Sequence, residues 1–148
     1  MRPPWSAIVL CGIDAALMAS ALYGGINFIM DPTGKSMGID FALPYIPYVE
    51  DFLIFGVWLV MVFSVFPAVL IYGLLTEKKW SLYGTMVLGV LEIVWIATQV
   101  VLFYSATGFT FLWALIGGFG VVSLILAPLP SMRNFYLAQR RTSSKKTA

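Results

Sequence analysis

The sequence has 148 residues, of which 60% are hydrophobic and 11% are charged, with a formal net charge of +2. A soluble domain is about 45–50% apolar and about 25% charged, so most of this surface is expected to face lipid rather than water. The sequence holds a single cysteine, Cys11, and no histidine. These counts exclude an intramolecular disulfide, a C-x-x-C redox pair and every site that depends on histidine ligands or a histidine base.

Four continuous apolar runs follow one another along the chain. A hydrocarbon core about 30 Å thick requires roughly 20 apolar residues in helical form, and backbone groups in lipid must be satisfied within the segment. The sequence therefore predicts an all-α fold, an integral membrane four-helix bundle within residues 1–132. The spans are expected at about residues 6–30, 52–75, 82–104 and 109–129, with an outer loop over residues 31–51.

The first run has a second interpretation. A basic start, an apolar stretch and the small residues Ala19-Ser20-Ala21 are also typical of a cleaved signal peptide. Asp14 interrupts the apolar stretch, and the apolar run continues beyond Ala21. Both features favour a retained span, and cleavage stays an open alternative.

Chemical signals mark the ends of the other spans. Asp31-Pro32-Thr33-Gly34 is a turn sequence that ends the first helix. The polar segment 76–81 separates the second and third spans, and Ser81 is expected to cap the third helix. Pro128 and Pro130 are expected to close the fourth.

Basic residues gather on one side of the predicted bundle. With four spans, the segments before the first, between the second and third, and after the fourth share a side, and they hold eight of the nine basic residues, all except Lys35. The positive-inside rule then places both termini in the cytoplasm and the protein in the cell membrane.

Residues 133–148 are expected to form a basic cytoplasmic tail whose last eight residues are disordered. The tail either anchors the topology or contacts anionic lipid headgroups, at about 1 kcal/mol per basic residue near the surface. The residues expected to make that contact are Arg133, Arg140, Arg141, Lys145 and Lys146.

Two acidic residues, Asp14 and Glu92, fall within the predicted spans. They lie about 12 Å and about 15 Å from the cytoplasmic ends of their helices, so both occupy nearly the same layer and are able to meet. An acid at mid-membrane costs about 2.5–3.5 kcal/mol and usually faces the bundle interior. We expect at least one of the two to carry a proton at neutral pH, because no basic residue lies in any span.

Further polar residues suggest a partly polar bundle interior. On the third span, a face with 3–4 spacing is formed by Thr85, Gly89, Glu92, Ile96, Gln99 and Phe103. Gln99 and Asn27 are expected in a common outer layer, and Ser64 lies on the second span. Three interpretations stay open: interhelical hydrogen bonds at about 0.6 kcal/mol each, a proton-responsive or solute-binding site, or contact with a partner subunit.

The outer loop contains an aromatic and apolar segment at residues 41–48. It is expected to lie in the headgroup region, with a lid over an outward-facing cavity or a docking surface for a partner as alternatives. Gly34-Lys35-Ser36 lacks the upstream glycine and the preceding strand of a phosphate-binding loop, so no nucleotide site is expected there.

The stretch from Gly24-Gly25 through Asp31-Pro32-Thr33-Gly34 to Gly56, together with Trp95-Ile96 in the third span, resembles small four-helix membrane proteins of bacteria and archaea. The resemblance implies a four-helix membrane protein and no particular activity. In size and span number the chain is also loosely similar to DoxX-like and quinone-linked redox proteins. The lack of a cysteine pair argues against the vitamin K epoxide reductase type.

The first functional hypothesis is a non-catalytic accessory or assembly subunit of a larger membrane complex. Its expected partners are the lipid bilayer and other membrane subunits or further copies of itself, with no nucleic acid, cofactor or metal. The alternative is a small proton-linked transporter that uses Asp14 and Glu92. A membrane enzyme acting on a lipid or quinone, with the two carboxyls as acid and base, is the third hypothesis.

Overall fold

The computed structural model describes residues 3–108 and 110–137, and within these residues every regular element is helical. The all-α prediction is therefore confirmed. Three helical stretches are long and apolar enough to cross a membrane, and a fourth is added if the bent pair α5 and α6 counts as one. The elements are α1 (Trp5–Met30), the 3-10 turns η1 (Lys35–Met37) and η2 (Asp40–Tyr45), α2 (Leu53–Val60), the π-helical segment η3 (Met61–Val65), α3 (Phe66–Leu75), α4 (Lys79–Thr107), α5 (Phe111–Leu126) and α6 (Pro130–Leu137).

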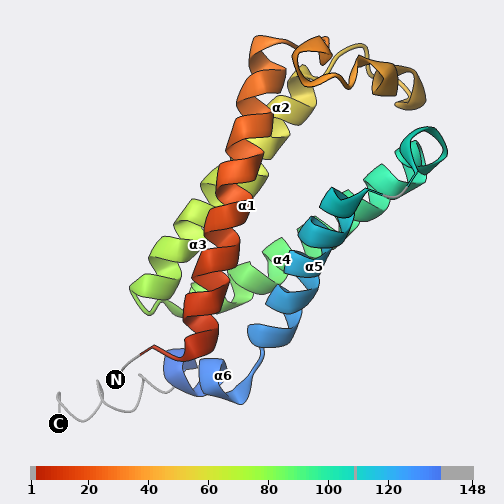
Figure 1. Ribbon diagram of the computed structural model, residues 1–148. Helices are drawn as coiled ribbons and strands as arrows, with labels where there is room; N and C mark the ends of the chain where they lie inside the picture. The colour runs from red at the N-terminus through yellow and green to blue at the C-terminus, as the bar shows by residue number, and fades with distance from the viewer. Residues whose placement is uncertain (1–2, 109, 138–148) are drawn as a thin grey trace, which may run out of the picture.

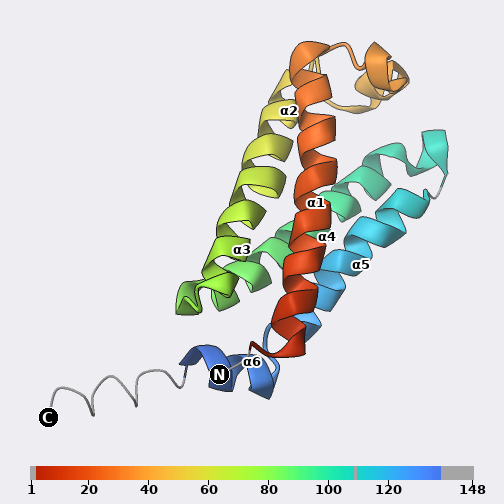
Figure 2. The ribbon, with the colours of Figure 1, turned by 60° about the vertical axis from the view of Figure 1, so that its left-hand side comes forward.

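The long helices form two groups that diverge (Figures 1 and 2). In the first group α1 packs along α2, η3 and α3, and in the second α4 packs along α5. The groups meet at the end of the molecule that carries α6, here called the α6 end. They separate toward the end that carries the loop 31–52, here called the loop end. The chain passes between the two groups at the turn of residues 76–78.

A π-helical segment interrupts the second apolar stretch directly before Pro67. Proline lacks a backbone N–H and its ring collides with the carbonyl four residues earlier, so a regular helix cannot continue through it unchanged. The wider π turn accommodates this defect at Met61–Val65. It also turns Ser64 toward α1, where the Ser64 hydroxyl donates to the carbonyl of Met18 at 3.2 Å.

Glycines allow the paired helices to approach closely. A Cβ built on Gly25 would lie 2.9 Å from the carbonyl oxygen of Gly56, and a Cβ on Gly56 would lie 2.9 Å from the carbonyl oxygen of Gly25. Small residues at such a crossing let two backbones touch. The α4–α5 pair uses the same arrangement.

Apolar side chains close the α6 end. Met132 and Tyr136, four residues apart on α6, are fully buried in a cluster with residues of α1, α3, α4 and α5. The Tyr136 hydroxyl donates to the carbonyl of Leu74 at 2.8 Å, which fixes α6 against the end of α3. Residues 133–137 therefore belong to this helix and not to a solvated tail, because Met132 and Tyr136 form one apolar face.

Two further boundaries differ from the expectation. The fourth apolar run is helical over 111–126 and then bends by 64° into α6, because Pro128 and Pro130 interrupt the ladder of backbone bonds. Ser81 is not a cap: α4 begins two residues earlier, at Lys79, and the Ser81 hydroxyl donates back to the carbonyl of Lys78 at 2.6 Å.

The loop end begins with a tight turn around Asp31. The Asp31 carboxylate accepts from the Thr33 hydroxyl at 2.6 Å and from the Ser36 backbone N–H at 2.7 Å. These two bonds lower the pKa of the Asp31 carboxyl. Gly34 follows with a φ of 75°, and a Cβ there would lie 2.7 Å from the ring of Phe52, so the turn needs glycine on both counts.

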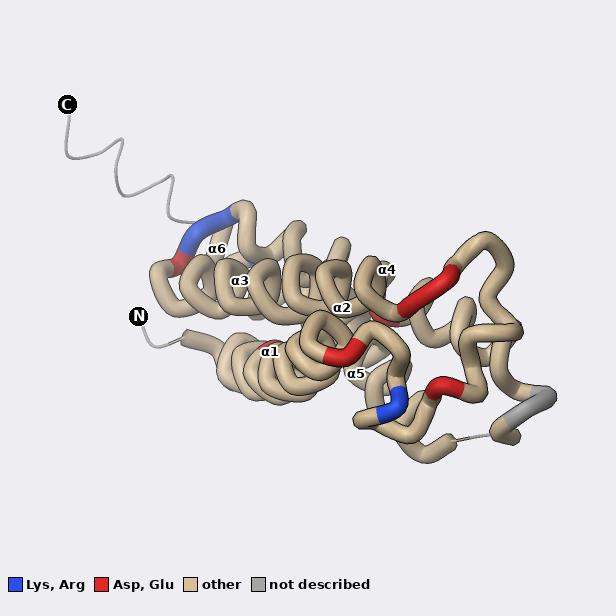
Figure 3. Tube along the Cα trace, turned by 90° about the horizontal axis from the view of Figure 1, so that it is seen from above, with Lys and Arg blue, Asp and Glu red and all other residues tan. Residues whose placement is uncertain are grey.

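Charged residues lie mainly at the two ends of the molecule (Figure 3). Lys78 and Lys79 lie at the α6 end, as does Arg133, which is exposed on α6. Lys35 lies at the loop end together with Asp31, Asp40, Glu50 and Asp51.

Candidate functional site

A cleft of about 590 Å³ is lined by residues of both helix groups and of the loop, in the half of the molecule toward the loop end. Binding sites for small molecules commonly measure about 300–1,000 Å³ and are lined mainly by apolar and aromatic side chains. This cleft matches that description. Its lining comes from both helix groups, and from the loop through Met37, Ile39, Phe41, Ala42 and Ile46.

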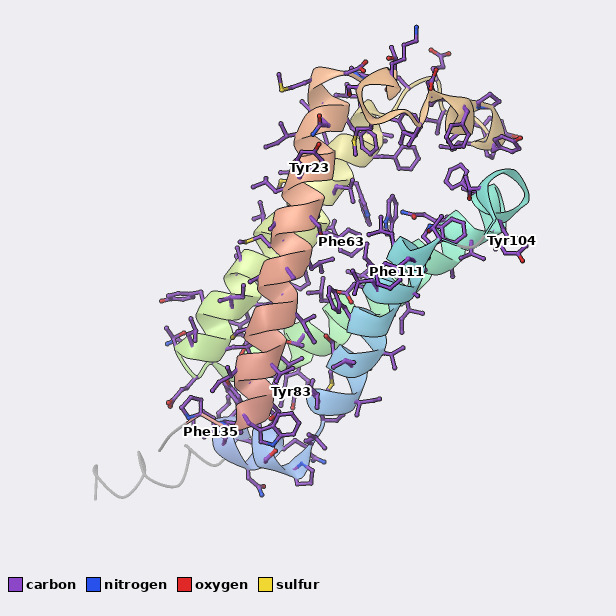
Figure 4. The ribbon with its side chains drawn as sticks, viewed as in Figure 1. Tyr23, Phe63, Tyr83, Tyr104, Phe111 and Phe135 are labelled. Atoms are coloured by element: carbon purple, nitrogen blue, oxygen red, sulfur yellow. The ribbon has the colours of Figure 1, made fainter. Side chains whose placement is uncertain are left out.

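Aromatic rings form one wall of the cleft. Phe28 stacks on Phe52 with ring centroids 5.0 Å apart, and Phe52 contacts Phe55 at 6.2 Å. The centroid of the Trp95 ring lies 6.0 Å from that of Phe55 and 5.9 Å from that of Phe63. Each of these five rings contacts the next, in a row that begins at the loop end. Figure 4 shows Phe63 between the two helix groups.

The α4–α5 side of the cleft carries an ordered polar pair. Trp113 on α5 donates its indole N–H to Oε1 of Gln99 on α4, at 2.9 Å. Because an indole only donates, the Gln99 oxygen must face Trp113 and the amide nitrogen must be the other atom. That nitrogen makes no side-chain hydrogen bond to any other described residue, and Gln99 lines the cleft.

Five hydroxyl side chains also line the cleft, and three of them already donate to a carbonyl of their own helix. Ser20 donates to Leu17 at 2.9 Å, Thr98 to Val94 at 2.9 Å, and Thr107 to Phe103 at 3.1 Å. The hydroxyls of the other two, Tyr23 and Thr110, make no hydrogen bond to any described residue. The cleft therefore offers the Gln99 amide and these two hydroxyls as donors.

Residues of the loop 31–52 cover the cleft at the loop end. Ala42 of η2 is buried with Phe28 and Phe52, and Phe103 of α4 packs against the same cluster. Of the aromatic segment 41–48, Phe41, Ala42 and Ile46 line the cleft. Tyr48 stands fully exposed with a φ of 63°.

Asp14 and Glu92 lie deeper than this cleft and are not among its lining residues. Both side chains are fully buried. None of their four oxygens has a hydrogen-bond partner among the described residues. Glu92 faces α5, where Oε2 lies 3.1 Å from the position that a Cβ on Gly120 would take.

The remaining predicted site residues are scattered. Ser64 connects η3 to α1, as described above, and Gln99 lies on the cleft. Asn27 donates to the carbonyl of Tyr23 in its own helix at 2.8 Å and makes no hydrogen bond to Gln99. Arg133 is exposed on α6. The other four predicted headgroup contacts, Arg140, Arg141, Lys145 and Lys146, lie outside the described residues.

The sequence reasoning missed Trp113 and the aromatic wall. Nothing in the sequence marks Trp113 as a site residue, because it lies in a uniformly apolar run. Its place in the site depends on the hydrogen bond to Gln99 of the neighbouring helix. Phe52, Phe55 and Phe63 fall within the second predicted span, where an aromatic residue is expected to face either lipid or the bundle core.

Over the described part of the chain, no three residues of the types His, Cys, Asp and Glu come together in a way that could hold a metal ion. The site is instead an apolar cleft with one oriented amide, above a buried pair of carboxyls. No protein-family model, curated protein or solved structure matches the chain.

Proposed function

We propose that the chain is a non-catalytic, four-span protein of the cell membrane with both termini in the cytoplasm. Three helices of sufficient length and apolarity, and a fourth formed by α5 with its bent continuation, support the four spans. Lys78, Lys79 and Arg133 at the α6 end support the cytoplasmic placement of that end. The cleft then opens in the outer half of the bilayer.

Within the membrane the protein acts as an accessory subunit of a larger complex and binds an apolar partner in the cleft. One observation carries this proposal: the large cleft is lined by apolar and aromatic side chains, one amide and a few hydroxyls, while both buried carboxyls lie outside its lining. Such a lining binds and orients a partner, whereas acid–base chemistry needs a titratable group within hydrogen-bond reach of the bound molecule.

Extraction in mild detergent, followed by mass measurement of the intact particle, tests the accessory role. We expect a particle heavier than one chain, containing other membrane subunits or a second copy. A photoreactive amino acid at Leu112, on the cleft, should then form a cross-link that is absent when the same group replaces Val94 on the far side of α4. A strictly monomeric particle without a cleft adduct contradicts the proposal.

A second function, proton-linked transport, is favoured by the buried carboxyl pair. Asp14 and Glu92 carry four oxygens with no partner among the described residues, and intramembrane acids of this kind commonly mark proton pathways. A transporter of this size requires a homodimer. Proteoliposomes should show a pH-dependent flux that Asp14→Asn and Glu92→Gln abolish, and a flux that survives both substitutions removes this function.

A further inference from the structure

We propose that the cleft binds one acyl chain of an ester-linked membrane lipid, with the ester carbonyl accepting a hydrogen bond from the Gln99 amide. This inference rests on the proposed function in one respect, since it assumes that the cleft is a binding site. It adds the chemical class of the occupant. Three features of the cleft argue for it: its apolar length, the Gln99 amide that Trp113 orients, and the absence of charge among its described lining residues.

The length of the cleft suits a lipid tail. Lining residues on α4 run from Trp95 to Thr107, a rise of about 18 Å at 1.5 Å per residue. The tails of one leaflet span about half of a hydrocarbon core about 30 Å thick. An apolar cleft of this length, left empty, would lose the dispersion contacts that a chain supplies. A flexible aliphatic chain in the bilayer is therefore the nearest occupant that fits.

The polar side chains of the cleft indicate which polar group the bound molecule carries. The Gln99 oxygen is held by the Trp113 indole, which leaves the two amide N–H groups as donors, and the lining hydroxyls of Tyr23 and Thr110 are also able to donate. The hydroxyls of Ser20, Thr98 and Thr107 already donate to their own helices. The bound molecule must therefore present an acceptor, as a carbonyl does.

The charge distribution separates an ester from a free fatty acid. None of the described residues that line the cleft is charged, so nothing there neutralises a carboxylate. Burying an unpaired charge is costly, whereas a neutral ester needs one hydrogen bond.

Tryptophan fluorescence in detergent tests the proposal. One variant keeps Trp113 alone, with Trp5, Trp58, Trp80 and Trp95 changed to Phe; a second keeps Trp58 alone, which is 45% exposed on α2. Each is titrated with phosphatidylcholine brominated on its acyl chains, with its ether-linked analogue and with a brominated fatty acid. We expect quenching of Trp113 to saturate at one ester lipid per chain, and quenching of Trp58 to rise without saturation.

The ether lipid lacks the carbonyl, so it should bind about 3- to 10-fold more weakly than the ester, which is the effect of one hydrogen bond. Gln99→Leu should abolish this difference between ester and ether. Equal binding of the ester and the ether by the unsubstituted Gln99 protein, or tighter binding of the fatty acid, overturns the proposal.

Two glycines on α1 give a matched pair of variants. Gly24 lines the cleft, and its added Cβ would meet Leu59 at 3.7 Å, so Gly24→Leu fills the cleft with little strain on the backbone. Gly12 is exposed, and its Cβ would meet nothing within 4 Å. Gly24→Leu should remove saturable quenching of Trp113 and Gly12→Leu should retain it. Equal saturable quenching in both variants places the lipid elsewhere and overturns the proposal.

The two proposals fail in different ways. If no lipid saturates the quenching of Trp113 but a membrane protein still cross-links at Leu112, the lipid is wrong and the accessory function stands. If neither a saturable lipid nor a cleft cross-link is found, both proposals fall.

Discussion

Gly89 of α4 and Gly120 of α5 touch through their backbones. A Cβ on Gly89 would lie 2.9 Å from the carbonyl oxygen of Gly120, and a Cβ on Gly120 would lie 2.8 Å from that of Gly89. The contact lies beside Glu92 and sets the separation of α4 and α5, and therefore the position of one side of the cleft.

Gly120→Leu should destabilise the protein by about 1–3 kcal/mol, because its side chain would have to displace the α4 backbone or Glu92. Thermal unfolding in detergent measures the loss. Gly118→Leu, two residues away, is the control, since a Cβ there would meet nothing within 4 Å. Equal unfolding temperatures for the two variants would disprove the close contact.

Replacing the carboxyl of Glu92 should stabilise the fold. Its two oxygens are buried and have no partner among the described residues, and an acid at mid-membrane costs about 2.5–3.5 kcal/mol. Glu92→Met removes that cost with a side chain of similar length and should raise the unfolding temperature. Val94→Met on the exposed side of α4 should leave it unchanged. A fall in the unfolding temperature with Glu92→Met would mean that the carboxyl makes a stabilising contact.

Tyr136→Phe should loosen α6 from the end of α3. The change deletes the hydrogen bond to the Leu74 carbonyl and should cost about 0.5–1.5 kcal/mol. Limited trypsin digestion should cleave faster at the exposed Arg133 in this variant than in the parent protein. Tyr83→Phe, at a side chain that is 57% exposed, is the control, and identical cleavage rates in the two variants would contradict the role of the bond.

The turn at Asp31 should weaken in acid. Hydrogen bonds from Thr33 and from the Ser36 backbone lower the pKa of this carboxyl in the folded protein. The stabilisation is therefore present above the pKa of the unfolded state and is lost as the pH falls through the lower folded value. The protection of the Ser36 amide, measured as its hydrogen-exchange rate relative to the intrinsic rate at the same pH, should fall over that range. Asp31→Asn should exchange faster at neutral pH and lose this acid dependence, and Asp40→Asn should behave as the parent does.

The helical class and the positions of the long helices could be predicted because they follow from local hydropathy, and the shared depth of Asp14 and Glu92 follows from the helical rise. The cleft could not, because it depends on the divergence of two helix groups, which no single segment encodes. The hydrogen bond between Trp113 and Gln99 likewise depends on the register of the α4–α5 hairpin. The sequence does indicate a helix at α6, because Met132 and Tyr136 stand one helical turn apart between polar residues.

The chain crosses from one helix group to the other at the turn 76–78, and an apolar cluster at that same end joins the groups. A second apolar cluster, which includes Phe63 of η3 and Leu88 of α4, also lies between them. At the loop end the described contact is side-chain packing of the loop on Phe103. The covalent chain therefore holds the two groups together at the α6 end, whereas their separation at the loop end depends on side-chain packing.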